Sequence, residues 1–381
     1  MNDDTHHPSN FDIHHDPFAS PERLQVGYSP FVRAAFDAAV ASPDAVPLRV
    51  ARVDAEGCTL LGAVEPVRAR IPNKLRKRSP PVVGDWVAVR ERRGELVVRQ
   101  RLERATALVR RAAGREGRAQ ALATNLDRVL VCTGLDRDFR LTRLERWLSL
   151  VYQSGAEPIV VLTKAGGVDA EERVDRLAAA RGLGAGRESG LAVLAVDVFA
   201  GLGLEELDAA LTADTPWAVS VALVGSSGVG KSTLLNHLSG RATMATGAVS
   251  EAHGKGRHTT SHRELFALPE RGLVVVDTPG LREVGMWGEG GGIDATFAEI
   301  TALAASCRFG DCQHAGEPGC AVTAAIEAGE LDPRRLDSMR RLAAERQATA
   351  RRASEHARRQ YERSFAKLVR TTIEAKERER G

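Results

Sequence analysis

Residues 225–232 read Gly225-Ser226-Ser227-Gly228-Val229-Gly230-Lys231-Ser232, which is a complete G-x-x-x-x-G-K-[ST] pattern. An apolar run at residues 219–224 precedes it, and residues 233–238, starting at Thr233, have the composition of a helix. A strand, a glycine-rich loop and a helix in this order form a phosphate-binding loop, whose backbone N–H groups turn toward a phosphate chain. Lys231 would reach the β- and γ-phosphates, and the Ser232 hydroxyl would ligate Mg²⁺.

Two segments further along the chain carry groups that a bound nucleoside triphosphate needs. Residues 274–280 read Val-Val-Val-Asp-Thr-Pro-Gly. Asp277 is expected to hold Mg²⁺ opposite Ser232, and the backbone N–H of Gly280 is expected to meet the γ-phosphate. Residues 254–261 read Gly-Lys-Gly-Arg-His-Thr-Thr-Ser, a polar loop in which Thr259 or Thr260 can sense the γ-phosphate. The three segments together favour a GTPase-type switch over a kinase or a motor ATPase.

The segment that would recognise the base lies before the phosphate loop and lacks one functional group. GTPases bind guanine with Asn/Thr-Lys-x-Asp, whose carboxylate accepts from the ring N1–H and the exocyclic amine. The corresponding residues here are Thr163-Lys164-Ala165-Gly166, so the carboxylate is missing. Its loss costs about 1–3 kcal/mol of discrimination. Asp169 is one candidate substitute, and a P-loop hydrolase of altered base specificity is the alternative interpretation.

Residues 46–108 show short alternating apolar runs between turn residues. The expected strands cover residues 49–53, 58–61, 63–64, 86–89 and 96–98. Five short strands fit an all-β OB-fold barrel, a fold whose face and loops bind oligonucleotides. The basic stretch at residues 68–78 would project from it as a loop. A structural barrel without a ligand is the alternative.

From residue 127 the sequence alternates between continuous apolar runs and amphipathic stretches. The expected strands cover residues 129–132, 158–162, 191–196, 219–224 and 273–276, and the expected helices cover residues 142–153, 170–181 and 204–211. Buried strands separated by helices predict a mostly parallel, doubly wound α/β sheet. The sequence after residue 333 is charged and helical, with paired arginines at helical spacings. It is expected to lie against the zinc module or RNA, with a coiled coil and a solvent-exposed helix as the alternatives.

The chain of 381 residues has a net charge of +3, but its basic residues gather in the N-terminal third and toward the C-terminus. This distribution suggests a polyanionic partner such as RNA, with solvated arginine-rich helices as the alternative. The sequence has neither an apolar stretch near the roughly 20 residues of a membrane span nor the pattern of a signal peptide. Its five cysteines do not resemble a disulfide framework. We therefore expect a cytoplasmic protein without membrane contact, with residues 1–44 as a mostly disordered tail that contains one short possible helix at residues 31–40.

Three cysteines and one histidine follow one another as Cys307-x₄-Cys312-x-His314-x₅-Cys320. Zinc in structural sites takes four thiolate or imidazole ligands in a tetrahedron. Glycines and a proline between the ligands allow the tight turns that such a site requires. This spacing predicts one structural zinc ion. Cys58 and Cys132 fall in expected strands and are interpreted as ordinary buried residues.

The order of these motifs resembles that of one family. A base segment, a phosphate loop, Gly-Arg-His-Thr-Thr and Asp-Thr-Pro-Gly follow one another, and the barrel contains Val-Gly-Asp-Trp-Val at residues 83–87. Residues 46–335 are therefore similar to the circularly permuted GTPases of the ribosome small subunit-dependent GTPase family (RsgA). The resemblance implies an OB-fold before the permuted GTPase domain and a zinc-binding domain after it. It also implies a role late in maturation of the small ribosomal subunit, which stimulates GTP hydrolysis when bound.

Two departures from the family pattern concern the base. Gly166 replaces the family's aspartate, and Asp197-Val198 stands where a Ser-Ala pair usually contacts the base. In this family the residue after Asp-Thr-Pro-Gly is apolar, as Leu281 is here, so no glutamine there can orient the attacking water. The resemblance implies that His258 does so, and a histidine that packs or contacts RNA is the alternative.

The sequence thus predicts a multidomain protein: an N-terminal OB-fold barrel at residues 45–108, a central circularly permuted α/β P-loop GTPase domain at residues 109–299, and a C-terminal α-helical zinc-binding domain at residues 300–381. The expected catalytic residues are Lys231, Asp277 and His258. Nucleotide contacts are expected from Thr163, Lys164, residues 225–233, Thr259, Thr260 and Gly280. The expected ligands are GTP or GDP with Mg²⁺ and one Zn²⁺, and the expected partner of a monomer is the small ribosomal subunit with its rRNA. A nucleotide-binding assembly factor without turnover is the alternative.

Overall fold

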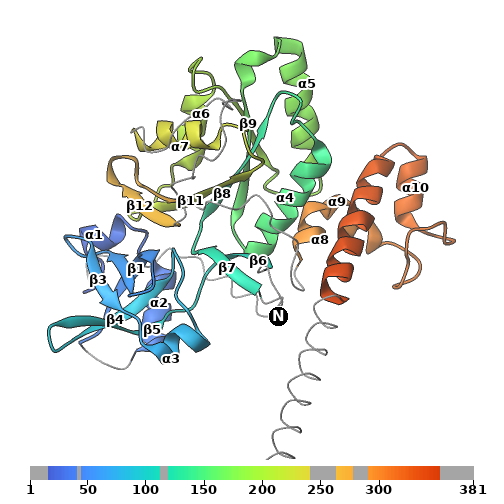
Figure 1. Ribbon diagram of the computed structural model, residues 1–381. Helices are drawn as coiled ribbons and strands as arrows, with labels where there is room; N and C mark the ends of the chain where they lie inside the picture. Colours follow the sequence, from blue (N-terminus) through green and yellow to red (C-terminus); the bar gives the residue numbers. More distant parts are fainter. Residues whose placement is uncertain (1–15, 41–43, 112–118, 241–262, 278–290, 352–381) are drawn as a thin grey trace, which may run out of the picture.

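The computed structural model describes residues 16–40, 44–111, 119–240, 263–277 and 291–351. Figure 1 shows three parts: a barrel in blue, a central sheet with helices on both sides, and a group of C-terminal helices in orange and red beside α4. Four residues with predicted roles lie outside the described residues, namely His258, Thr259, Thr260 and Gly280.

The N-terminal part is a closed barrel with strand order β1-β2-β3-β5-β4, in which only the β3–β5 pair is parallel. Its elements are β1 Val46–Val53, β2 Cys58–Leu61, β3 Val67–Arg70, α3 Asn73–Arg78, β4 Trp86–Arg92 and β5 Glu95–Arg101. Five closed strands with a helix between the third and fourth confirm the predicted OB-fold. Inward-facing Leu48, Val50, Leu60, Val87 and Val98 fill its core.

Two expectations for the barrel were wrong in detail. The third strand is β3, at Val67–Arg70, and not residues 63–64. The apolar residue Val64 suggested a strand there, but it is 83% exposed. The basic stretch at residues 68–78 is not a loop: it comprises the end of β3 and the short helix α3. The basic side chains of α3 are therefore held on a helix.

Residues 16–40 are more ordered than predicted, although the possible helix at residues 31–40 agrees with the structure. They form α1 Pro21–Leu24 and α2 Pro30–Ala39, and Val26, Tyr28 and Phe36 are buried. The Tyr28 ring meets that of Trp86 edge-on, with centroids 5.6 Å apart. The composition of this segment concealed a few well-spaced apolar residues that pack on the barrel.

The central sheet has the order β10-β9-β8-β11-β13-β12, and all its strands are parallel except the edge strand β12. The strands are β8 Arg128–Gly134, β9 Glu157–Thr163, β10 Ala192–Val196, β11 Val219–Gly225, β12 Glu264–Leu268 and β13 Leu273–Asp277. The helices are α4 Leu141–Ser154, α5 Ala170–Arg181, α6 Leu204–Leu211 and α7 Lys231–Ser239, with short 3₁₀ turns η1 Ala165–Gly167, η2 Gly182–Gly184 and η3 Pro269–Arg271. This arrangement confirms the predicted doubly wound fold, while β12 was not anticipated.

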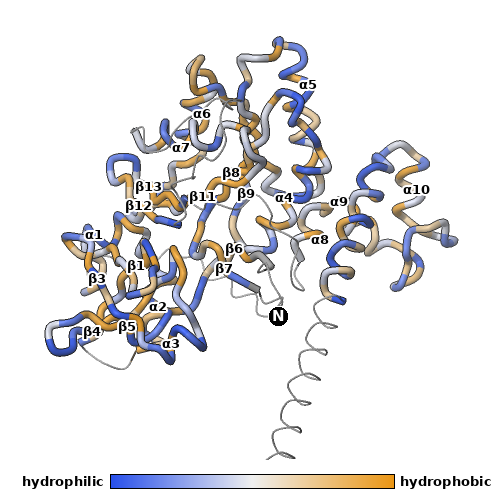
Figure 2. Tube along the Cα trace, viewed as in Figure 1, coloured by the Kyte–Doolittle hydropathy of each residue, from blue (hydrophilic) through white to orange (hydrophobic). Residues whose placement is uncertain are grey.

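Alternate residues of each strand face opposite layers of helices. Val129 and Val131 of β8 pack in the same cluster as residues of α4, whereas Leu130 packs with residues of α6 and α7. Figure 2 shows hydrophobic residues along β8 and β11 and hydrophilic residues along the outer side of α5. Burial of both faces explains why these strands read as continuous apolar runs in the sequence.

A hairpin and one buried arginine join the barrel to the central sheet. The hairpin, β6 Ala107–Arg111 and β7 Ala119–Thr124, lies between the two parts in the chain and was not predicted. Arg49 of β1 is 1% exposed. Its guanidinium donates to the Val26 carbonyl at 2.6 Å, the Ser220 hydroxyl at 2.7 Å and the Asn125 carbonyl at 2.7 Å. Because Ser220 belongs to β11, this side chain connects the barrel directly to the strand of the phosphate loop.

The C-terminal part is helical, as predicted. It contains α8 Gly292–Thr296, α9 Ala298–Ala304, α10 Ala321–Glu327 and a helix at residues 333–351. Leu336 and Leu342 bury this last helix against the rest of the module, and Arg335 pairs with Glu145 of α4 and Glu299 of α9. None of the helices in the described ranges is long and apolar enough to cross a membrane.

Candidate nucleotide-binding site and metal cluster

The phosphate loop lies between β11 and α7, at the carboxyl edge of the central sheet. Gly225, Gly228 and Gly230 have φ angles of 138°, 77° and 92°. A Cβ added at Gly225 would lie 2.1 Å from the carbonyl oxygen of Cys132 in β8. The path of the loop therefore requires glycine at this position.

Lys231 begins α7 and extends back across the loop. Its ammonium donates to the carbonyl oxygen of Gly225 at 2.9 Å and also to that of Ser226. The Ser226 hydroxyl accepts from Arg143, which pairs with Asp138. Sequence reasoning missed Arg143 because it belongs to α4, 83 residues from Ser226, and no local motif marks it.

Asp277 ends β13, the parallel neighbour of β11, so it lies at the same edge as Ser232. Its side chain is half-buried, and Glu264 of β12 stands directly opposite it in the strand register. Burial, with a smaller contribution from the charge of Glu264, raises the pKa of Asp277. A carboxylate in such surroundings is stabilised by a cation, which fits the predicted Mg²⁺ position.

The base segment at the end of β9 is bonded to the phosphate loop. The Thr163 hydroxyl, which is 6% exposed, donates to the Val229 carbonyl oxygen at 2.5 Å. The Lys164 ammonium pairs with Asp136 at 2.7 Å. Two predicted nucleotide contacts, Thr163 and Lys164, thus lie beside the loop that is expected to bind the phosphates.

Two carboxylates could replace a side chain at Gly166, and the structure shows that they have different contacts. Asp169 caps the N-terminus of α5, where it accepts from the backbone N–H of Glu172 at 2.8 Å. Asp197, which follows β10, accepts from the backbone N–H of Gly166 at 3.0 Å. Sequence reasoning noted Asp197 only as a departure, because the contact depends on the pairing of β9 with β10.

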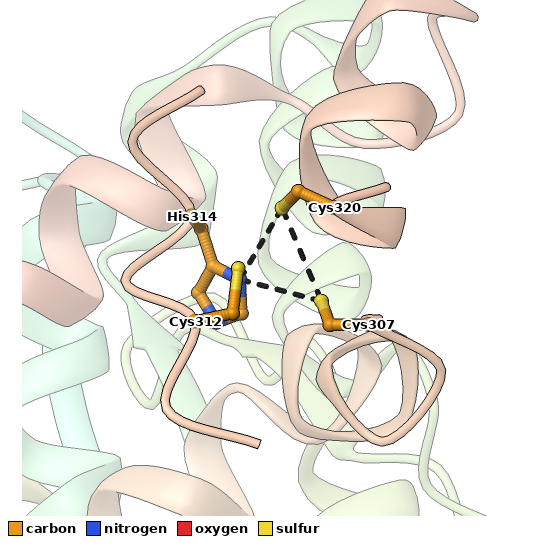
Figure 3. Close-up of side chains that lie close together, drawn as sticks. All are labelled: Cys307, Cys312, His314 and Cys320. Carbon is orange, nitrogen blue, oxygen red and sulfur yellow. Dashed lines mark hydrogen bonds between the residues drawn. The ribbon is translucent and has the colours of Figure 1, made fainter. Parts of the chain in front are cut away.

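The cysteine and histidine side chains converge, as Figure 3 shows. All four ligand atoms lie within 4.8 Å of one another. The Sγ atoms of Cys307 and Cys320 are 3.9 Å apart, and they lie 3.6 and 3.5 Å from Nδ1 of His314. Tetrahedral zinc with ordinary bond lengths places its ligand atoms about 3.5–3.8 Å apart. The predicted cluster is confirmed as a group that can hold one metal ion.

Local backbone and hydrogen bonds shape this cluster. His314 adopts a positive φ of 59°, and its Nδ1 faces the Sγ atoms of Cys307 and Cys320. Cys320 caps α10 and accepts from the Thr323 backbone N–H at 3.3 Å. Burial opposes ionisation of the Cys320 thiol, but hydrogen bonds from Thr323 and His314 outweigh it and lower its pKa to about 6. A thiolate is the form that binds metal.

These features define a class of protein: a P-loop GTPase in which the base segment precedes the phosphate loop, with a barrel before it and a metal-binding helical module after it. The chain belongs to the RsgA GTPase family. The model of that family matches residues 101–287. A relative from Opitutus terrae, named small ribosomal subunit biogenesis GTPase RsgA, is 43% identical over 353 residues, covering 86% of this chain and 90% of the relative.

Two solved structures share the fold. YjeQ from Thermotoga maritima superimposes with a TM-score of 0.58 at 23% identity, covering 78% of this chain and 96% of that protein. YloQ, described as a circularly permuted GTPase, superimposes with a TM-score of 0.57 at 24% identity, covering 80% of this chain and 96% of that protein. The predicted architecture is confirmed by these similarities.

Proposed function

We propose that this chain hydrolyses GTP to GDP and phosphate in the biogenesis of the small ribosomal subunit, with turnover stimulated by the bound subunit. The observation that supports this most directly is an intact phosphate loop bonded to the base segment through Thr163 and Val229. The printed name of the Opitutus terrae relative supplies the biological setting.

In this proposal, different residues at the carboxyl edge of the sheet bind the phosphates and hold Mg²⁺. The N-terminus of α7 and the loop backbone bind the phosphates, and Lys231 leaves the Gly225 carbonyl to pair with phosphate oxygens. Ser232 and Asp277 would hold Mg²⁺, which neutralises charge on the β- and γ-phosphates. Among residues outside the described ranges, His258 is proposed to orient water, and Thr259 or Thr260, with Gly280, to contact the γ-phosphate.

The proposed rRNA contact rests on the barrel. The helix α3 presents Lys74, Lys77 and Arg78, all exposed, on one short element. Positive side chains on an OB-fold suit the phosphate backbone of RNA. We further propose that the protein works as a monomer in the cytoplasm, where small subunits are assembled.

The metal in the Cys₃His cluster is proposed to be zinc with a structural role. Three thiolates and one imidazole are ligands that zinc prefers, and four protein ligands leave no position for water. The helix at residues 333–351 supports this role, because Arg340 donates to the carbonyl oxygens of Gln313 and His314 beside the cluster. Metal analysis of the purified protein should find one zinc per chain.

Phosphate release with GTP, ATP and XTP, with and without purified small subunits, tests the proposal. We expect release from GTP to rise when subunits are added, and to fall to background in Lys231→Ala, because the charge that pairs with the phosphates is then lost. Lys77→Ala, on the exposed side of α3, is the matched control and should keep the subunit-free rate.

Two other outcomes separate the alternatives. Equal binding and turnover of the three nucleotides would identify a P-loop hydrolase of altered base specificity. Release no greater than that of Lys231→Ala, despite nucleotide and subunit binding, would identify an assembly factor without turnover.

A further inference from the structure

We propose that Asp197 is the specificity-determining residue of the base site, and that its carboxylate binds the donor edge of guanine in place of a side chain at Gly166. The proposal deepens the proposed function and rests on it, since it concerns how GTP is chosen. The carboxylate that recognises the base would then come from the segment after β10, and not from the segment after β9.

The strand register brings the two positions together. β10 runs parallel to β9 with Val196 opposite Thr163, so the next residues, Asp197 and Lys164, leave the sheet side by side. This carboxyl edge is where doubly wound sheets bind ligands. The bond from Thr163 to Val229 fixes the same edge to the phosphate loop. Asp197 therefore belongs to the nucleotide side of the molecule.

The Asp197 carboxylate fills the space that a side chain at position 166 would enter. A Cβ built on Gly166 would lie 3.0 Å from Oδ2 and 3.4 Å from Cγ of Asp197. A second carboxylate on that Cβ would begin in contact with the first, and like charges at such distances oppose each other's ionisation. The absence of a side chain at Gly166 thus leaves room for the Asp197 carboxylate. The space beside Gly166 holds one carboxylate, which comes from the residue after β10.

Three backbone N–H groups orient this carboxylate. Oδ2 accepts from Gly166 at 3.0 Å, while Oδ1 accepts from Phe199 at 3.0 Å and from Ala200 at 3.1 Å. An ionised carboxylate offers about four acceptor positions, so one remains on Oδ2, and the N1–H and the exocyclic amine of guanine would share it. Reciprocal backbone hydrogen bonds between Asp197 and Leu202 close the turn that holds the group in place.

Guanine is the base that suits a fixed acceptor. Its edge carries the N1–H and the exocyclic amine, both donors, whereas adenine presents an unprotonated N1 and xanthine a carbonyl in place of the amine. The Asp197 carboxylate is partly exposed. A bound base would cover it, and an acceptor that then meets another acceptor disfavours the wrong ligand. The other nearby carboxylates are engaged, Asp169 with the start of α5 and Asp136 with Lys164.

Equilibrium binding of GDP, XDP and ADP to the full chain tests the assignment without interference from turnover. Asp197→Asn should weaken GDP binding by roughly 5- to 150-fold, the range expected when one partner of a hydrogen bond at a desolvated group is lost. Its XDP affinity should hold or rise, because the amide can donate to the xanthine carbonyl. The matched control, Asp169→Asn, should leave the ratio of GDP to XDP affinity unchanged.

A carboxylate swap provides the second arm. Asp197→Ser should lose GDP preference, and adding Gly166→Asp to it should restore the preference, since the carboxylate returns to the same volume from the other strand. A role limited to holding the turn would predict that Asp197→Asn and Asp197→Ser weaken GDP and XDP equally and that Gly166→Asp rescues neither; that result overturns the assignment. If instead the unmodified chain binds the three nucleotides equally, the proposed GTP specificity itself fails.

Discussion

The route of the phosphate loop depends on single residues, and Gly225 is the clearest case. Both its positive φ and the nearby Cys132 carbonyl exclude a side chain. Gly228 also has a positive φ, but nothing lies within 4 Å of an added Cβ. A substitution at Gly228 would therefore test backbone strain alone, whereas a substitution at Gly225 would test backbone strain and steric overlap together.

We expect Gly225→Ala to lower the free energy of unfolding by about 2–5 kcal/mol, because overpacking adds about 1–3 kcal/mol to a backbone penalty of about 1–2 kcal/mol. Gly228→Ala should cost only the backbone penalty. Urea denaturation of the nucleotide-free protein measures both. Equal losses in the two variants would show that the Cys132 carbonyl moves aside.

Among the elements, the helix at residues 333–351 is tied to its neighbours by one mostly buried arginine side chain. Arg335 donates to Glu145 at 2.7 Å, to Glu299 at 2.7 Å and to the Thr296 carbonyl at 2.8 Å, and it lies over the Phe297 ring. The carboxylates of Glu145 and Glu299 are 4% and 16% exposed. This contact joins the metal-binding module to α4 of the GTPase domain.

Arg335→Met should destabilise the protein by about 3–5 kcal/mol, since it leaves the buried carboxylate of Glu145 and the mostly buried one of Glu299 without their cation. Arg334→Met is the matched control: that side chain is 91% exposed, so a change within about 0.5 kcal/mol is expected. Thermal and urea denaturation give the comparison. Similar stabilities of the two variants would mean that the buried ion pairs contribute nothing net.

Sequence patterns predicted the elements that have a clear hydrophobic periodicity and clear residues marking their ends. The predicted helices at residues 170–181 and 204–211 coincide with α5 and α6, and the four metal ligands could be identified because they lie within fourteen residues. The edge strand β12 and the hairpin β6–β7 were missed because their pairing partners, not local periodicity, define them. The contact of Asp197 with Gly166 spans 31 residues and follows only from strand register.

At the scale of the whole molecule, the barrel and the sheet meet at Arg49. A fully buried arginine is held there mainly by carbonyl and hydroxyl oxygens, and burial lowers its pKa to about 10, against the attraction of Asp127 and Asp85. It is still a cation at neutral pH. The fork of the guanidinium reaches acceptors from three segments at once, which a single ammonium cannot do.

Arg49→Lys should therefore cost about 2–4 kcal/mol, because buried oxygens that lose their donor cost about 1–3 kcal/mol each. Arg99→Lys, on an exposed position of β5, is the control and should be neutral. Limited proteolysis should cut the Arg49→Lys protein between barrel and sheet more readily. Resistance equal to that of the control would show that the hairpin alone maintains the docking.

The strand order has a consequence for synthesis of the chain. The strands β8, β9 and β10 leave the ribosome before β11, and 29 residues separate Val196 from Gly225. At about 5–20 residues per second, that interval lasts about 1.5–6 s. A three-stranded parallel sheet that formed meanwhile would present the backbone of β8, bordered by apolar side chains, to neighbouring nascent chains. In the permuted order, the strand of the base segment is made before the phosphate loop. This order also leaves β8, which later lies inside the sheet, as an open edge strand while translation continues.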